Sequence, residues 1–211
     1  MMSRMQVQQQ HAESSKPTNV DKPRVFTVWQ KSSMGFQGTD GFSVYDDTGR
    51  LVFRVDNYSR RQKCLTKEIV LMDGVGNPLL WLRPQILSLH DRWNAYEVEE
   101  CGNKQPDSRL FSMKRYSMLH NFDKAEVSLR NLSDINNKSK SMPSFRIDGC
   151  CFEKNSCKIS DNRGNEVAQI SRKTTLETSV LLGNDVFSLV IQPGFDCKLV
   201  VAFVIVMDRI R

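Results

Sequence analysis

The chain has 211 residues, 39% of them hydrophobic and 26% charged, which is enough to bury the core of one domain or of two small ones. Thirty basic against 24 acidic residues give a net charge of +6, which permits binding to anionic lipid or nucleic acid without requiring it. The mean hydropathy of −0.44 excludes a polytopic membrane protein, and the longest strictly apolar run, nine residues at 199–207, is too short to cross a bilayer.

The first 23 residues are polar, contain three consecutive glutamines and end at Pro23, which predicts a disordered leader. No apolar stretch follows Arg4, so the segment does not resemble a secretory signal, and we expect a cytoplasmic or nuclear protein. The six cysteines are then reduced thiols that are buried or half-buried. They form no C-x-x-C pair and only three histidines accompany them, so we expect neither a metal site nor another cofactor.

From Arg24 onward the apolar residues alternate with polar ones, with a period of two. This alternation is typical of antiparallel strands that bury one face. It is clearest at residues 51–55, 96–98, 125–129, 145–147 and 187–191. The polar segment 131–143 is expected to be a long loop.

The motif Asp-x-x-Gly occurs three times between apolar runs, at residues 46–49, 73–76 and 161–164. The aspartate can accept hydrogen bonds from its own turn, and the glycine supplies the positive φ with which the next strand begins. The first and third turns have similar flanking sequences, which is consistent either with two related halves or simply with shared turn chemistry.

The last apolar segment, residues 199–210, fits two structures. Its valines and isoleucines favour a strand, whereas its length of 12 residues, Asp196 before it and Arg209 within it favour a helix. Such a helix is apolar on all sides, so it must be buried on all sides. At about 18 Å it would match a strand of five or six residues, so a sheet of short strands could enclose it.

Four blocks of the chain resemble the plant LURP-one-related family. They are LSLHDRW at 87–93, GFQGTDGFSVYDDTGRLVFRVDNY at 35–58, GCCFEKNSCKISDNRGNEVAQISRK at 149–173 and GNDVFSLVIQPGFDCKLVVAFVIVMDRI at 183–210. The resemblance implies an all-β, tubby C-terminal-like domain over residues 24–211, a twelve-stranded antiparallel barrel that encloses a hydrophobic C-terminal helix. Phospholipid scramblases share this fold, which does not by itself transfer function.

No catalytic constellation is recognisable. Ser88 and His90 would share one strand face while Asp91 points to the other, whereas a triad needs its histidine between its two partners. The chain also lacks the Gly-rich phosphate-binding motifs, and the best candidate for a calcium loop, near Asp134, has one acidic residue and then turns basic. We therefore expect a protein that is not an enzyme.

Tubby-type binding of phosphoinositides needs basic side chains that converge on a phosphorylated headgroup. The candidates for such a site are Arg60, Arg61, Lys63, Lys67 and Arg83. Nucleic acid is not an expected partner, because no recognition helix or zinc module is present, and Trp29, Trp81 and Trp93 have the settings of core residues.

The resemblance thus implies a binding or scaffold protein in plant defence or stress signalling, with a protein partner that the sequence does not identify. Phosphoinositides could tether it to the plasma membrane as a peripheral protein. The alternative is a lipid-handling protein of the scramblase type, although the cysteine-rich and proline-rich segments of scramblases are missing. A small-molecule-binding barrel is less favoured, because the helix of this fold fills the lumen.

Overall fold

The computed structural model describes residues 22–30, 41–55, 68–85, 91–98, 109–115, 124–130, 142–149, 156–173 and 185–210. These residues form strands β1 (Arg24–Gln30), β2 (Phe42–Tyr45), β3 (Leu51–Val55), β4 (Ile69–Asp73), β5 (Pro78–Pro84), β6 (Arg92–Glu97), β7 (Arg109–Arg115), β8 (Lys124–Leu129), β9 (Phe145–Asp148), β10 (Ser156–Asp161), β11 (Glu166–Arg172) and β12 (Val186–Ile191), and helix α1 (Cys197–Arg209). Several predictions lie outside the described residues: the leader up to residue 21, the loop 131–141, and Ser88, His90 and Asp134.

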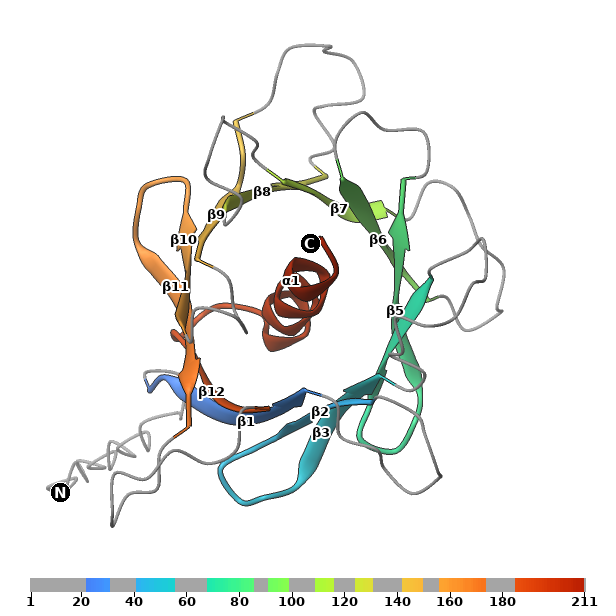
Figure 1. The fold of residues 1–211 in the computed structure, drawn as a ribbon, viewed down its shortest axis with the longest axis vertical. Coiled ribbons are helices and arrows are strands. Elements are labelled where there is room, and N and C mark those ends of the chain that lie inside the picture. Colours follow the sequence, from blue (N-terminus) through green and yellow to red (C-terminus); the bar gives the residue numbers. More distant parts are fainter. Residues whose placement is uncertain are drawn as a thin grey trace, which may run out of the picture.

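The strands form one closed antiparallel barrel in which each strand pairs with its neighbours in sequence. Strand β12 pairs with β1, from Arg24 opposite Ile191 to Trp29 opposite Val186, and this pairing closes the ring. Helix α1 runs through the middle of the ring (Figure 1). The prediction of a twelve-stranded barrel around a C-terminal helix is therefore confirmed.

The barrel has two chemically different ends. We call the end where α1 begins the entry end; β1 starts there at Arg24, and the turn from β2 to β3 lies there as well. We call the opposite end, where α1 finishes, the exit end. There Gln30, the last residue of β1, donates a hydrogen bond of 2.8 Å from Nε2 to Oδ1 of Asp208 in the last turn of the helix.

The three Asp-x-x-Gly turns have the predicted chemistry. The carboxylate of Asp161 accepts hydrogen bonds from the backbone N–H groups of Arg163 and Asn165, and Gly164 has φ +87°. The side-chain amides of Asn165 and Asn77 donate to Asp161 and Asp73 respectively. At the equivalent place in the first turn stands Arg50, so the contacts relate the third turn to the second more closely than to the first.

Helix α1 begins as its sequence predicts. Oδ1 of Asp196 accepts a hydrogen bond of 2.8 Å from the backbone N–H of Lys198, which satisfies one of the free donors of the first turn. Every residue from Val200 to Asp208 is buried. Phe203 has no exposed surface, and its ring meets Phe111 edge-on at 4.9 Å and Phe145 at 5.3 Å between centroids. The helix is thus the central part of the hydrophobic core.

The prediction that Trp29, Trp81 and Trp93 are core residues is right for Trp93 alone, because Trp81 is only half-buried on the outer face of β5. Trp93 is buried as expected, but Trp29 lies on the outer face of β1 with 45% of its surface exposed, edge-on to Tyr45. Its neighbour Gln30 faces inward, because it bonds to the buried Asp208. Phe26 and Val28 share this inward face and are buried, so the alternation of the strand places Trp29 on the outside.

We expect Phe203→Ala to lower the free energy of unfolding by about 3–5 kcal/mol, since it removes a large side chain from a site enclosed on all sides. Urea denaturation followed by circular dichroism measures this loss. Val25→Ala, at a position that is 47% exposed, is the matched control and should change stability by less than about 0.5 kcal/mol. Equal effects of the two substitutions would contradict the enclosed helix.

The turn carboxylates predict a dependence of stability on acid. The hydrogen bond from the Asn165 amide is the main cause that lowers the pKa of Asp161, and desolvation of the carboxylate opposes it. A carboxyl group whose pKa is lower in the folded than in the unfolded state stabilises the fold above the unfolded pKa of about 4. This contribution is lost as pH falls through the folded pKa.

Asp161→Asn keeps an acceptor in the turn but removes its charge. Urea denaturation at pH 7 should therefore show the variant less stable than the parent protein, and this difference should shrink at pH 3. Asp47→Asn is the control, because the Asp47 carboxylate accepts no hydrogen bond within the part of the chain that the structure describes. If the stability difference between Asp161→Asn and the parent protein were the same at pH 7 and pH 3, the role of the Asp161 charge would be contradicted.

Candidate functional site

A half-open cleft of about 890 Å³ lies at the entry end, between the start of β1, the β2–β3 turn and the β12–α1 connection. The ladder between β1 and β12 stops at the pair Arg24–Ile191. Just beyond this pair stand Pro23 and Pro193, and a proline has no N–H with which to extend a ladder. The two prolines thus explain why the segments separate here and leave room between them.

The carboxylates that line this entry cleft differ in what they bind. Asp196 caps helix α1, and Asp46 accepts hydrogen bonds from Thr48 and Arg50 of its own turn. The Thr48 hydroxyl, at 2.6 Å, is the main cause that lowers the pKa of Asp46, so the group stays ionised. Asp47 is exposed and has no side-chain partner within the described residues.

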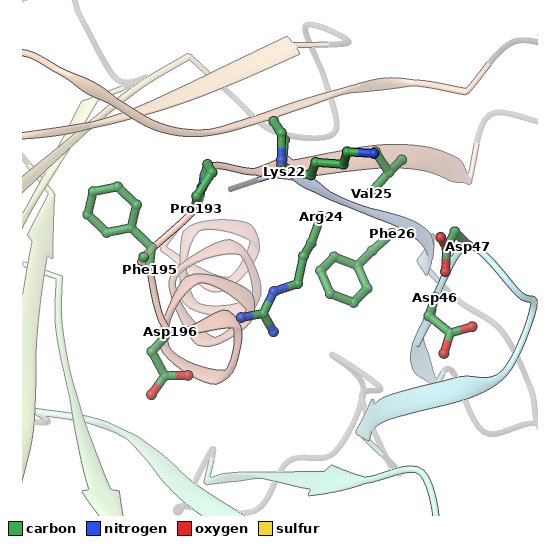
Figure 2. A pocket seen from close by; sticks show the side chains of 11 residues that line it. Lys22, Arg24, Val25, Phe26, Asp46, Asp47, Pro193, Phe195 and Asp196 are labelled. Carbon is green, nitrogen blue, oxygen red and sulfur yellow. The ribbon is translucent and has the colours of Figure 1, made fainter. Parts of the chain in front are cut away.

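Two basic side chains also line the entry cleft. Figure 2 shows Arg24 extending between Phe26 and Asp196, toward the first turn of α1. Lys22 lies beside it, and both residues are exposed. In the part of the chain that the structure describes, neither side chain has a hydrogen-bond or ion-pair partner. The entry cleft therefore offers two unpaired cations, one unpaired carboxylate and apolar walls.

Among the described residues, the cysteine thiol nearest to the entry cleft is not poised to react as a nucleophile. Cys197, at the start of α1, is buried, and burial raises the pKa of its thiol, an effect that the charge of Arg24 only partly opposes. A protonated, buried thiol is a poor nucleophile. Cys157 is buried as well, so the prediction of buried thiols holds for both cysteines that the structure describes. Within these residues no group of three or more His, Cys, Asp or Glu could hold a metal ion.

Arg83, the one predicted headgroup residue that the structure describes, lies on the outer face of β5. Its Nη2 is 2.7 Å from Oε1 of Glu68. Its guanidinium carbon lies 5.7 Å from the ring centroids of both Trp81 and Tyr96. Arg83 is thus already paired with a carboxylate and packed against two aromatic rings, a geometry that stabilises the outer wall of the barrel.

The other predicted headgroup residues, Arg60, Arg61, Lys63 and Lys67, lie outside the described residues. The described residues on either side of their segment, Val55 at the end of β3 and Glu68 before β4, are at the exit end. These two flanking residues thus lie at the same end of the barrel as Arg83, opposite to the entry cleft. Sequence reasoning missed the entry cleft, although Pro23 and Pro193 could have indicated it.

Asp91 is the one member of the Ser-His-Asp group within the described residues. It is exposed, and its backbone carbonyl accepts a hydrogen bond from the N–H of Arg115. It therefore ends a strand pairing. No helix in the described part of the chain is long and apolar enough to cross a membrane.

Comparisons with known proteins agree with this fold. The model of the LURP-one-related family matches residues 24–208. Protein LURP-one-related 5 of Arabidopsis thaliana is 37% identical, over 89% of this chain and 83% of its own length. Protein LURP-one-related 12 from the same plant is 36% identical, over 90% and 79%. None of these names states a catalytic activity.

A crystal structure of a protein from Arabidopsis thaliana superposes with a TM-score of 0.60 at 22% identity, and the match covers 90% of this chain and 93% of the other. That likeness concerns the fold alone. The family match over nearly the whole barrel and the sequence identity to several relatives show in addition that the chain shares an ancestor with them. The chain belongs to the LURP-one-related family.

Proposed function

We propose that this protein is a non-enzymatic binding or scaffold protein that acts through the outside and the ends of its barrel. The observation that supports this most is the position of α1, whose residues from Val200 to Asp208 are all buried inside the ring of strands. The space in which barrels of other kinds hold a small ligand is occupied by the protein's own helix. Partners must therefore bind to surface residues.

For the exit end we propose attachment to phosphoinositide membranes through Arg60, Arg61, Lys63 and Lys67. Basic residues near an anionic leaflet contribute about 1 kcal/mol each, and the net charge of +6 favours such a surface. Arg83 would take part only if a phosphate replaced the carboxylate of Glu68, to which it is paired. The protein would then be peripheral at the plasma membrane.

The proposed biological role is that of a regulator in plant defence or stress signalling. The support for it is membership in a plant family whose members are linked in general to defence. A peripheral membrane protein with a second surface for a protein partner is suited to such a role, because it can bring that partner to the membrane.

Flotation of the purified full chain with phosphatidylcholine vesicles, with and without phosphatidylinositol bisphosphate, tests this attachment. We expect binding that requires the phosphoinositide and weakens in high salt. The triple variant Arg60→Glu, Arg61→Glu, Lys63→Glu should weaken binding by about a hundredfold, at about 1 kcal/mol per basic residue. Unchanged flotation of this variant would rule out these residues as the attachment site.

The matched control reverses three other exposed arginines, as Arg109→Glu, Arg146→Glu and Arg163→Glu, at positions on β7, β9 and the β10–β11 turn. It changes the net charge by the same amount, so an equal loss of binding would assign the effect to overall charge. Arg83→Gln is measured separately. Because Arg83 is paired with Glu68 and packed against two rings, we expect Arg83→Gln to lower the melting temperature of the protein and to leave its vesicle binding nearly unchanged.

A further inference from the structure

We propose that the entry cleft binds a short peptide segment of a protein partner. This segment would place one acidic side chain against Arg24 and apolar side chains against Phe26 and Phe195. The inference rests on the proposed binding function and names the partner's chemistry. It concerns the opposite end of the barrel from the proposed membrane attachment.

The barrel topology decides how such a peptide could bind. A closed ring of twelve strands has no free edge, so a peptide cannot join the sheet as an added strand. It needs a hollow in which its side chains find partners. Beyond the Arg24–Ile191 pair the chain segments separate and provide this hollow. Its volume of about 890 Å³ is near the upper end of the range for small-ligand pockets, about 300–1,000 Å³.

The charged side chains of the entry cleft indicate which charge the ligand carries. The guanidinium of Arg24 is unpaired within the described residues and extends between Phe26 and Asp196 (Figure 2). A guanidinium prefers a planar carboxylate or a phosphate as its partner. The carboxylates of Asp46, Asp47 and Asp196 line the same cleft, so a headgroup with several phosphates would be repelled. A ligand with a single acidic group avoids most of this repulsion.

Asp47 adds a second preference. Its carboxylate is exposed and has no hydrogen-bond or ion-pair partner in the described ranges. A peptide can satisfy it with a lysine, an arginine or its own backbone N–H groups. A segment that carries one acidic and one basic side chain beside apolar residues therefore complements the unpaired groups of the cleft better than a polyanion does.

The apolar walls supply the remaining contact surface. Phe26, with 6% of its surface exposed, closes one side of the cleft, and the ring of Phe195 packs edge-on against Phe145. Val25 at the rim is 47% exposed. Phe26 and Phe195 are held in place by the core and give the cleft a fixed apolar wall, and the half-exposed Val25 supplies the more accessible apolar surface.

Selection from a phage-displayed library of random dodecapeptides on the immobilised full chain tests the proposal. Phage that bind the Arg24→Glu variant are removed first, so that peptides dependent on Arg24 are enriched. We expect the enriched peptides to share an acidic residue next to apolar ones. Fluorescence anisotropy with a labelled enriched peptide should show binding at least about tenfold weaker to Arg24→Glu, the loss typical of one charge-assisted hydrogen bond.

Three further measurements complete the design. Arg163→Glu, an equal charge reversal at an exposed turn arginine, should leave peptide affinity unchanged. Asp47→Lys should weaken the binding of peptides that carry a basic residue. A peptide in which lysine replaces the acidic residue should regain affinity for Arg24→Glu, and this rescue separates direct pairing from a general disturbance of the fold.

The proposal is overturned if no peptide is enriched, or if enriched peptides bind the parent protein and Arg24→Glu equally. It is also overturned if Arg24→Glu abolishes vesicle flotation, because the entry cleft would then be a lipid site. Peptide binding that persists in the Arg60, Arg61 and Lys63 variant would show that the two ends act independently. Failure of the membrane attachment and failure of the peptide site are thus separate results.

Discussion

The structure depends on one constraint, which is that a helix with apolar residues on every side must be enclosed on every side. Helix α1 meets it because short strands, of four to seven residues each, form a ring about as tall as the helix is long. The strands in turn bury their inward faces against the helix, since a ring of twelve strands would otherwise leave a wide lumen. Barrel and helix therefore stabilise each other, and neither has a core without the other.

The polar groups of this core lie at the two ends of the helix. Asp196 caps the first turn at the entry end, where solvent and the cleft meet. Asp208 lies buried at the exit end and accepts a hydrogen bond from Gln30, so both of these buried polar side chains have a partner inside the barrel. Gln30 shares the inward face of β1 with the buried Phe26 and Val28, and the alternation of the strand leaves Trp29 outside.

Sequence reasoning succeeded where the determinant is local. Three features depend on residues that lie close together in the sequence and could therefore be predicted from it. They are the Asp-x-x-Gly turns, the Asp196 cap and the length of the last apolar segment. It failed at Trp29, because β1 carries apolar residues on both of its faces, so the alternation alone does not tell which face is enclosed. It could not find the Glu68 partner of Arg83, since strand register is a property of the closed ring. It missed the entry cleft, although Pro23 and Pro193 mark where the strands stop.

A filled barrel without edges limits how the protein can evolve new partners. The strands must keep their inward side chains for α1 and their backbone groups for one another, so variation is tolerated at the ends, where chain segments leave the ladder. The entry cleft combines acidic and basic groups, and the sequence between Val55 and Glu68, the flanking residues at the exit end, carries four basic residues. Ligands at opposite ends of such a barrel would contact different residues, so binding at one end would leave the residues of the other end accessible.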